Sequence, residues 1–198
     1  MTALPLVFED TPPPEVAASE RVAADRSTRQ PVLLFFHSAV TWLVIGSVMG
    51  LVASLKFQFP DWLTSQAMWT FGRVRTAHLN AVAYGWASMA LVGVAVWMIP
   101  RLVRAPLHRP VFAMAAAVGW NLFVLLGIGA VLAGWSDGLE WLEIPYPIDA
   151  IVAVSGGLMA FSVLMTVARR RTKHFYVSVW YVLAAMVWVG GGTTAAVV

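Results

Sequence analysis

The sequence predicts an all-α protein, a polytopic bundle of transmembrane helices. Of its 198 residues, 60% are hydrophobic and only 12% are charged, and the mean hydropathy is +0.75. The charged residues gather in short patches between apolar runs, and each run has about the 20 residues needed to cross the hydrocarbon core of a bilayer. A soluble domain of this length does not need so apolar a composition. We therefore expect a lipid bilayer as its surroundings.

Five apolar runs follow one polar segment. Residues 1–30 are rich in Pro and Ala and carry both signs of charge, which predicts a mobile cytoplasmic tail. Residues 31–198 form the predicted transmembrane domain. Its five spans are expected at Val32–Leu55, Phe71–Ile99, Val111–Ala133, Ile148–Ala168 and from Phe175 to Val198.

The distribution of lysine and arginine predicts the direction of the spans. The tail, the loop after the second span and the RRRTK patch at 169–173 hold three, three and four basic residues, all on one side of the membrane. The other side holds three, Lys56, Arg73 and Arg75. By the positive-inside rule the N-terminus is cytoplasmic. Since the basic residues flank the spans, the net charge of +3 does not indicate a nucleic-acid partner.

His78, near the N-terminal end of the second span, is the main candidate for a functional residue. Arg73 and Arg75 precede it, so an imidazole and two positive charges lie within about two helical turns. An ionisable side chain inside a membrane is a functional candidate by default. Imidazole can ligate haem iron, and guanidinium groups suit the propionates. The alternative is a histidine that bonds a helix neighbour, with arginines anchored at the headgroups.

Small residues leave one face of the second span with few bulky side chains. In a helix that begins near Phe71, this face holds His78, Ala81, Val82, Gly85 and Met89. Because Ala81 and Gly85 are small, a flat ring or a neighbouring backbone can lie close to it. The GSVMG patch of the first span, residues 46–50, likewise permits close helix packing.

No second histidine of this sequence is expected within reach of an iron bound to His78, and Met49 of the first span, which lies at a plausible depth, is more commonly a packing residue than an axial ligand. His37 lies about 18 residues, or roughly 27 Å along the helix axis, from the outer end of the first span. His108 and His174 are expected in loops on the cytoplasmic side. The chain has no cysteine, which excludes an iron–sulfur cluster or a thiolate zinc site ligated by this chain.

The segment FGRVRTAHLNAVAYGWASMALVGVAVWMIPRL, residues 71–102, resembles the second transmembrane helix of subunit I of the haem-copper oxidases, especially the cbb3-type cytochrome c oxidases. The likeness continues through WSDGLEWLEIPYPID and KHFYVSVWY and covers about Val32 to Tyr181. It implies the N-terminal part of a bundle of twelve or more helices that carries a low-spin haem b, a high-spin haem and a copper. Such an enzyme, in the bacterial inner membrane, passes electrons from cytochrome c to oxygen, forms water and translocates protons.

The resemblance also implies roles for particular residues. His78 matches the axial ligand of the low-spin haem, and Arg75 matches an arginine near its propionates, with Arg73 as a second candidate. Glu140 and Glu143 fall in the loop where the family holds a calcium ion. The implied partners are the remaining helices of subunit I and the cytochrome c subunits of the oxidase.

The ligands of the second haem and of copper lie on later helices in the family. Those cofactors are therefore expected only in the complete subunit, and this chain alone is not expected to reduce oxygen. Two alternatives stay open at this point. One is a fragment of the large subunit of a nitric oxide reductase, and the other is a haem-free membrane protein with a structural or assembly role.

Overall fold

A computed structural model describes residues 12–139, 141 and 143–195, which form helices joined by short loops, with no strand in this part of the chain. The order of elements is α1 (Pro14–Gln58), the 3-10 helix η1 (Ala67–Trp69), α2 (Phe71–Asn80), the π-helix η2 (Ala81–Ala87), α3 (Ser88–Leu102), α4 (Pro110–Ala133), α5 (Tyr146–Ala168) and α6 (Val177–Ala195). The predicted all-α class is confirmed.

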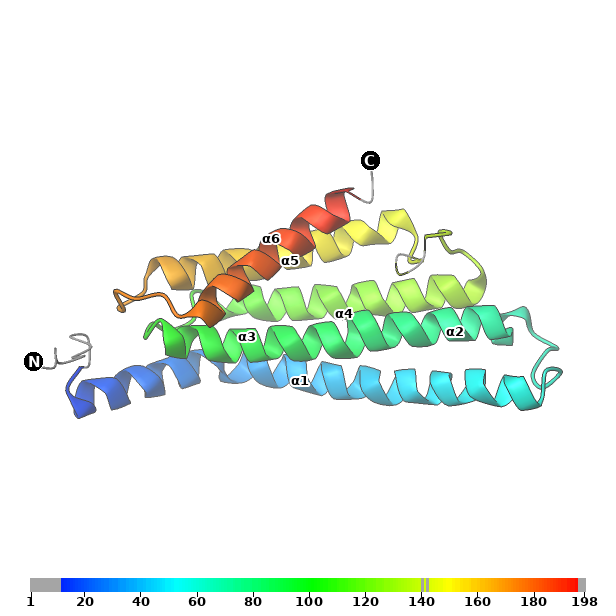
Figure 1. The fold of residues 1–198 in the computed structure, drawn as a ribbon, viewed down its shortest axis with the longest axis horizontal. Coiled ribbons are helices and arrows are strands. Elements are labelled where there is room, and N and C mark those ends of the chain that lie inside the picture. Colours follow the sequence, from blue (N-terminus) through cyan, green and yellow to red (C-terminus); the bar gives the residue numbers. More distant parts are fainter. Residues whose placement is uncertain (1–11, 140, 142, 196–198) are drawn as a thin grey trace, which may run out of the picture.

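The helices lie side by side with α1 along one edge of the bundle (Figure 1). α2, η2 and α3 form one continuous rod against α1, and α4 packs against both α1 and α5. α6 crosses α5 obliquely and also contacts α3. Large apolar side chains on the outer faces, such as those of Leu91, Leu125 and Val154, remain exposed. Outward apolar side chains are expected where helices meet lipid or further helices.

Four helical segments are long and apolar enough to cross a bilayer: α1, the rod Phe71–Leu102, α4 and α5. α4 and α5 end at the predicted residues, Ala133 and Ala168, and begin within two residues of the predicted starts. The fifth predicted span corresponds to α6, whose apolar stretch Val177–Trp188 is, within the described part of the chain, shorter than the other four spans. The helical membrane bundle follows from the hydropathy pattern.

The prediction of a mobile tail is wrong for residues 14–30, which are the first part of the 45-residue helix α1. Pro14 stands in the first turn, where its missing N–H is not needed, and the Ala-rich sequence after it favours a helix. Pro31 lies inside the helix, and α1 bends in this region (Figure 1). Residues 1–11 of the predicted tail lie outside the described residues.

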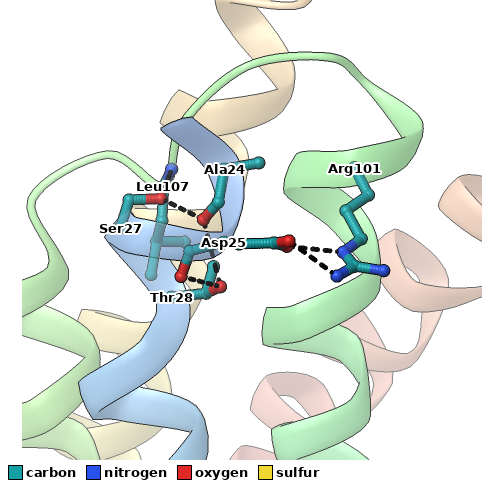
Figure 2. Close-up of polar contacts among 6 residues, drawn as sticks. All are labelled: Ala24, Asp25, Ser27, Thr28, Arg101 and Leu107. Atoms are coloured by element: carbon teal, nitrogen blue, oxygen red, sulfur yellow. Dashed lines mark hydrogen bonds and ion pairs between the residues drawn. The ribbon is translucent and has the colours of Figure 1, made fainter. Parts of the chain in front are cut away.

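Ion pairs hold this N-terminal extension of α1 against the ends of other helices. The carboxylate of Glu20, 8% exposed, accepts hydrogen bonds from Arg104 at 2.7 Å and from Arg171 at 3.1 Å. Asp25 accepts two bonds from the guanidinium of Arg101, at 2.6 and 2.8 Å (Figure 2). The extension, the α3–α4 loop and the segment after α5 therefore meet at one end of the bundle. The count of basic residues placed these three segments on one side of the membrane.

Glu20→Gln is expected to lower the free energy of unfolding by about 1–3 kcal/mol, because bonds from two guanidinium groups to a buried carboxylate are weakened. Thermal unfolding in detergent, followed by circular dichroism, measures the effect. Glu15→Gln is the matched control, since Glu15 is exposed in the first turn of the same helix. Its effect should stay below about 1 kcal/mol, the usual limit for a charge near a helix end. Equal effects of the two substitutions would contradict a specific role for Glu20.

Candidate functional site

The imidazole of His78 points from the third turn of α2 toward α1. Its Nδ1 lies 2.7 Å from the carbonyl oxygen of Gly46. Because a carbonyl oxygen only accepts hydrogen bonds, Nδ1 carries the proton in this contact. In the neutral ring the free lone pair is then on Nε2. This is the arrangement of a metal-ligating histidine, whose other nitrogen donates to a carbonyl or carboxylate.

Two glycines one turn apart on α1 allow a close approach of the second span, and Gly50 makes room for this ring. A Cβ added at Gly50 would lie 2.8 Å from Cε1 of His78, and one added at Gly46 would lie 2.9 Å from Cγ2 of Val82. The GSVMG patch predicted close packing, and close packing occurs there. Sequence reasoning missed that Gly46 is the hydrogen-bond acceptor of His78. The GxxxG spacing of Gly46 and Gly50 signals a close approach between helices but does not name the side chain that enters.

α1 covers the face of the second span that carries the small residues. Ala81, Gly85 and Met89 are buried, and a Cβ added at Gly85 would lie 2.6 Å from Cγ of Trp42. The sequence allowed either a flat ring or a neighbouring backbone on this face. In the structure, α1 and the Trp42 indole fill it. The face of the helix that carries Gly85 therefore leaves no space for a haem macrocycle.

A π-helix, η2, begins at Ala81, three residues after His78. A π-turn inserts a residue into the α-helical pattern and leaves carbonyl groups open to other donors. Trp120 of α4 donates its indole N–H to the carbonyl of Tyr84 at 2.9 Å, and the Ser88 hydroxyl donates to the carbonyl of Ala83 at 2.8 Å. Such bulges occur often at functional sites. The sequence did not predict this π-helix, which is in contact with α4.

The two predicted arginines have different surroundings. Arg73 is half-buried and donates from Nη1 to the carbonyl of Leu132 at 3.1 Å. Its guanidinium occupies the place that a Cβ of Gly134 would take, and Gly134 ends α4 with a φ of 96°. Arg73 therefore caps the C-terminal end of α4, where a cation is favourable.

Arg75 is exposed and lies three residues before His78, on the same side of α2. Within the described part of the chain it has no hydrogen-bond partner. Its guanidinium is therefore available to a carboxylate, whereas that of Arg73 is already engaged.

Of the two predicted calcium ligands, Glu140 lies outside the described residues. Glu143 accepts a hydrogen bond from the side-chain amide of Asn80 at 3.1 Å, and Asn80 is 1% exposed. The Tyr84 hydroxyl donates to the carbonyl of Trp141, so the acidic loop is fastened to α2 and η2. Among the described residues no group of three or more His, Cys, Asp or Glu side chains could hold a metal ion. Of the two predicted calcium ligands, Glu143 is thus the one that the structure describes, and calcium takes about six to eight oxygens.

The residues present fit one side of a haem site. His78 offers Nε2, and Arg75 offers an exposed guanidinium on the same side of α2. His37 is exposed on α1 and bonds the carbonyl of Leu33 in its own helix at 2.7 Å. His108 lies in the α3–α4 loop and His174 after α5, at the opposite end from the start of α2. The other three histidines, all of them described, therefore lie away from His78.

Comparison with known proteins identifies the family. Residues 30–197 match the family model described as Cytochrome C and Quinol oxidase polypeptide I. The chain is 29% identical over 148 residues to the cbb3-type cytochrome c oxidase subunit CcoN1 of Stutzerimonas stutzeri, covering 74% of this chain and 31% of that protein. It is 28% identical over 150 residues to a cytochrome c oxidase subunit 1 homolog of Agrobacterium tumefaciens, covering 76% of this chain and 28% of that protein.

Cytochrome c oxidase subunit 1 of Rhodobacter capsulatus is similarly related, with 28% identity over 149 residues, 74% of this chain and 28% of that protein. The chain therefore spans about 30% of the length of the curated relatives it matches. The family match, in contrast, covers nearly the whole described helical bundle. The chain belongs to the cytochrome c and quinol oxidase polypeptide I family, the subunit I of haem-copper oxidases.

Proposed function

We propose that this chain supplies one axial ligand of a low-spin haem b in subunit I of a cbb3-type cytochrome c oxidase. The ligand is Nε2 of His78. The observation that carries the proposal is the Nδ1 contact with Gly46, which leaves Nε2 as the nitrogen with a free lone pair. The family match and the relative named as a cbb3-type subunit support the assignment.

Each neighbouring residue has its own part in this proposal. The Gly46 carbonyl fixes the tautomer and the direction of the His78 ring, and Gly50 leaves the space for it. Arg75 binds a propionate, and Arg73 contributes indirectly by fixing the end of α4 next to α2. Trp42 fills the space beside Gly85. When bound, haem b accepts electrons and passes them on one at a time.

The complete enzyme would need parts that this chain does not provide. The remaining helices of subunit I supply the second axial ligand, the second haem and the copper, and cytochrome c subunits deliver electrons for the reduction of oxygen with proton translocation. The chain lies in the bacterial inner membrane with its N-terminus in the cytoplasm. A calcium ion at Glu140 and Glu143 is the remaining part of the proposal, and metal analysis of the purified protein tests it.

The test is to express the chain together with the remaining helices of subunit I and to measure haem. Reduced-minus-oxidised difference spectra should show one low-spin haem b for each chain, and haem extraction measures the total haem, which includes the second haem of the complete subunit. Protein that inserts in the membrane, keeps its helical circular dichroism and binds no haem would contradict the proposal. That outcome would instead favour a structural or assembly role.

Arg75→Gln is expected to lower the midpoint potential of the haem by roughly 50 mV, because removing a nearby positive charge stabilises the oxidised form. Arg73→Gln removes the bond to Leu132 and should lower the free energy of unfolding by about 1–2 kcal/mol. It should change the potential less than Arg75→Gln does. Redox titration and thermal unfolding of the two variants separate the effects. Equal shifts in potential would contradict the separate roles of the two arginines.

A further inference from the structure

A basic pocket of about 570 Å³ lies at the end of the bundle where α4 begins and α5 ends. It is lined by the α3–α4 loop and by the segment after α5, through Ala105, Pro106, Leu107, His108, Arg109, Arg169 and Arg171. None of the proposed haem ligands contributes to it. Because it lies at the ends of two apolar spans, the pocket is at the level of the lipid headgroups.

Positive charge dominates this pocket. Three arginines line it and no carboxylate does. Arg109 and Arg169 are exposed and form no ion pair with the acidic side chains that the structure describes, whereas Arg171 shares Glu20 with Arg104. The N-terminal end of α4 starts directly after Arg109 and adds partial positive charge.

His108 lies in the same positive field. Its pKa is lowered, first by burial and then by the positive charges of Arg169 and Arg109. The charges of both arginines therefore act at the same place. A lowered pKa keeps the imidazole neutral at pH 7, so its ring presents a hydrogen-bond donor without adding a further charge.

The pocket wall is fixed by the protein itself. The backbone N–H of His108 donates to the hydroxyl of Thr166 at 2.8 Å, and the hydroxyl of Ser162 donates to the carbonyl of His108 at 2.6 Å. The backbone N–H of Leu107 donates to the hydroxyl of Ser27 at 2.9 Å (Figure 2). These bonds tie the loop to α5 and to α1. Little ordering is therefore needed when a ligand enters, which favours binding.

We propose that this pocket binds the phosphate group of an anionic phospholipid in the leaflet at this end of the bundle. Guanidinium groups bind phosphate through pairs of parallel hydrogen bonds, and Arg109 and Arg169 are the two pocket arginines that form no ion pair with the acidic side chains that the structure describes. Basic pockets between helices at the membrane surface are suited to anionic headgroups. Pro106 and Leu107 give the same pocket an apolar side, which suits the part of the lipid next to its headgroup.

Native mass spectrometry of the delipidated, detergent-purified protein tests the proposal, with phosphatidylglycerol, phosphatidylcholine and inorganic phosphate as separate additions. Arg109→Gln/Arg169→Gln is expected to bind phosphatidylglycerol about thirtyfold more weakly, since each basic residue near an anionic surface is worth about a factor of five. Arg26→Gln/Arg29→Gln is the matched control. It removes the same charge from exposed positions of α1 that do not line the pocket, and it should change binding by less than about twofold.

An equal loss of binding in the two double variants would overturn the pocket and leave only general surface charge. Binding of inorganic phosphate without preference for phosphatidylglycerol over phosphatidylcholine would overturn the lipid assignment. Circular dichroism checks that each variant is folded. If the double variant does not fold, Arg109→Gln alone should still show about a fivefold loss, and no loss would again overturn the proposal.

Discussion

His78→Ala is expected to remove nearly all of the low-spin haem b from the assembled subunit. The substitution deletes the nitrogen that would ligate iron. The other described histidines cannot replace it, because His37 faces outward on α1 and His108 and His174 lie at the far end of the bundle. The α-band of the low-spin haem in reduced-minus-oxidised spectra should fall to background, and extracted haem should fall by one for each chain.

His37→Ala is the matched control for this variant. His37 is also a histidine inside a transmembrane helix, but its Nδ1 bonds the Leu33 carbonyl of its own helix. The difference spectrum should therefore be unchanged. If His78→Ala retained the low-spin spectrum while His37→Ala lost it, the ligand assignment would be wrong.

Gly50→Ala is expected to displace the His78 ring and reduce haem content several-fold. In the interior of a helix, replacing glycine by alanine ordinarily stabilises by about 1 kcal/mol. Here the new methyl group would lie 2.8 Å from Cε1 and 2.9 Å from Nδ1 of His78, so the ring or α1 must move. Overpacking of this kind costs about 1–3 kcal/mol. The low-spin electron paramagnetic resonance signal and the midpoint potential report the position of the ring directly.

Gly129→Ala in α4 provides the comparison, because apart from its chain neighbours and the nearby backbone of its own helix nothing lies within 4 Å of a Cβ added there. It should raise thermal stability slightly and leave the haem signals unchanged. A Gly50→Ala protein that is less stable but keeps normal haem signals would show that Gly50 supports helix packing only. Altered haem signals at unchanged stability would support a positioning role for Gly50.

The spans could be predicted well from the sequence because hydropathy alone sets them. α4 and α5 have sharp polar boundaries, and their predicted and observed ends agree. The prediction of a mobile tail was wrong because composition alone does not determine the structure of that segment. The composition of residues 14–30 is compatible with either disorder or helix, and the ion pairs of Glu20 and Asp25 with Arg101, Arg104 and Arg171 decide the outcome.

The candidate site was predictable in its residue types and not in its contacts. The sequence indicated His78 and its two arginines, but nothing local showed that Arg73 turns to the end of α4, 59 residues away, while Arg75 stays exposed. The carbonyl of Gly46, 32 residues from His78, is equally invisible to a pattern of side chains. The haem ligation itself stays a prediction.

The N-terminal extension of α1 has a consequence for the order of assembly. Glu20 lies 151 residues before Arg171, so the carboxylate is synthesised long before its second partner. At roughly 5–20 residues per second, the interval is roughly 8–30 s. The pairs with Arg101 and Arg104 can close once α3 and the residues directly after it have been made. The pair of Glu20 with Arg171 can close only after α5 has been made, so the first segment synthesised is among the last to complete its contacts.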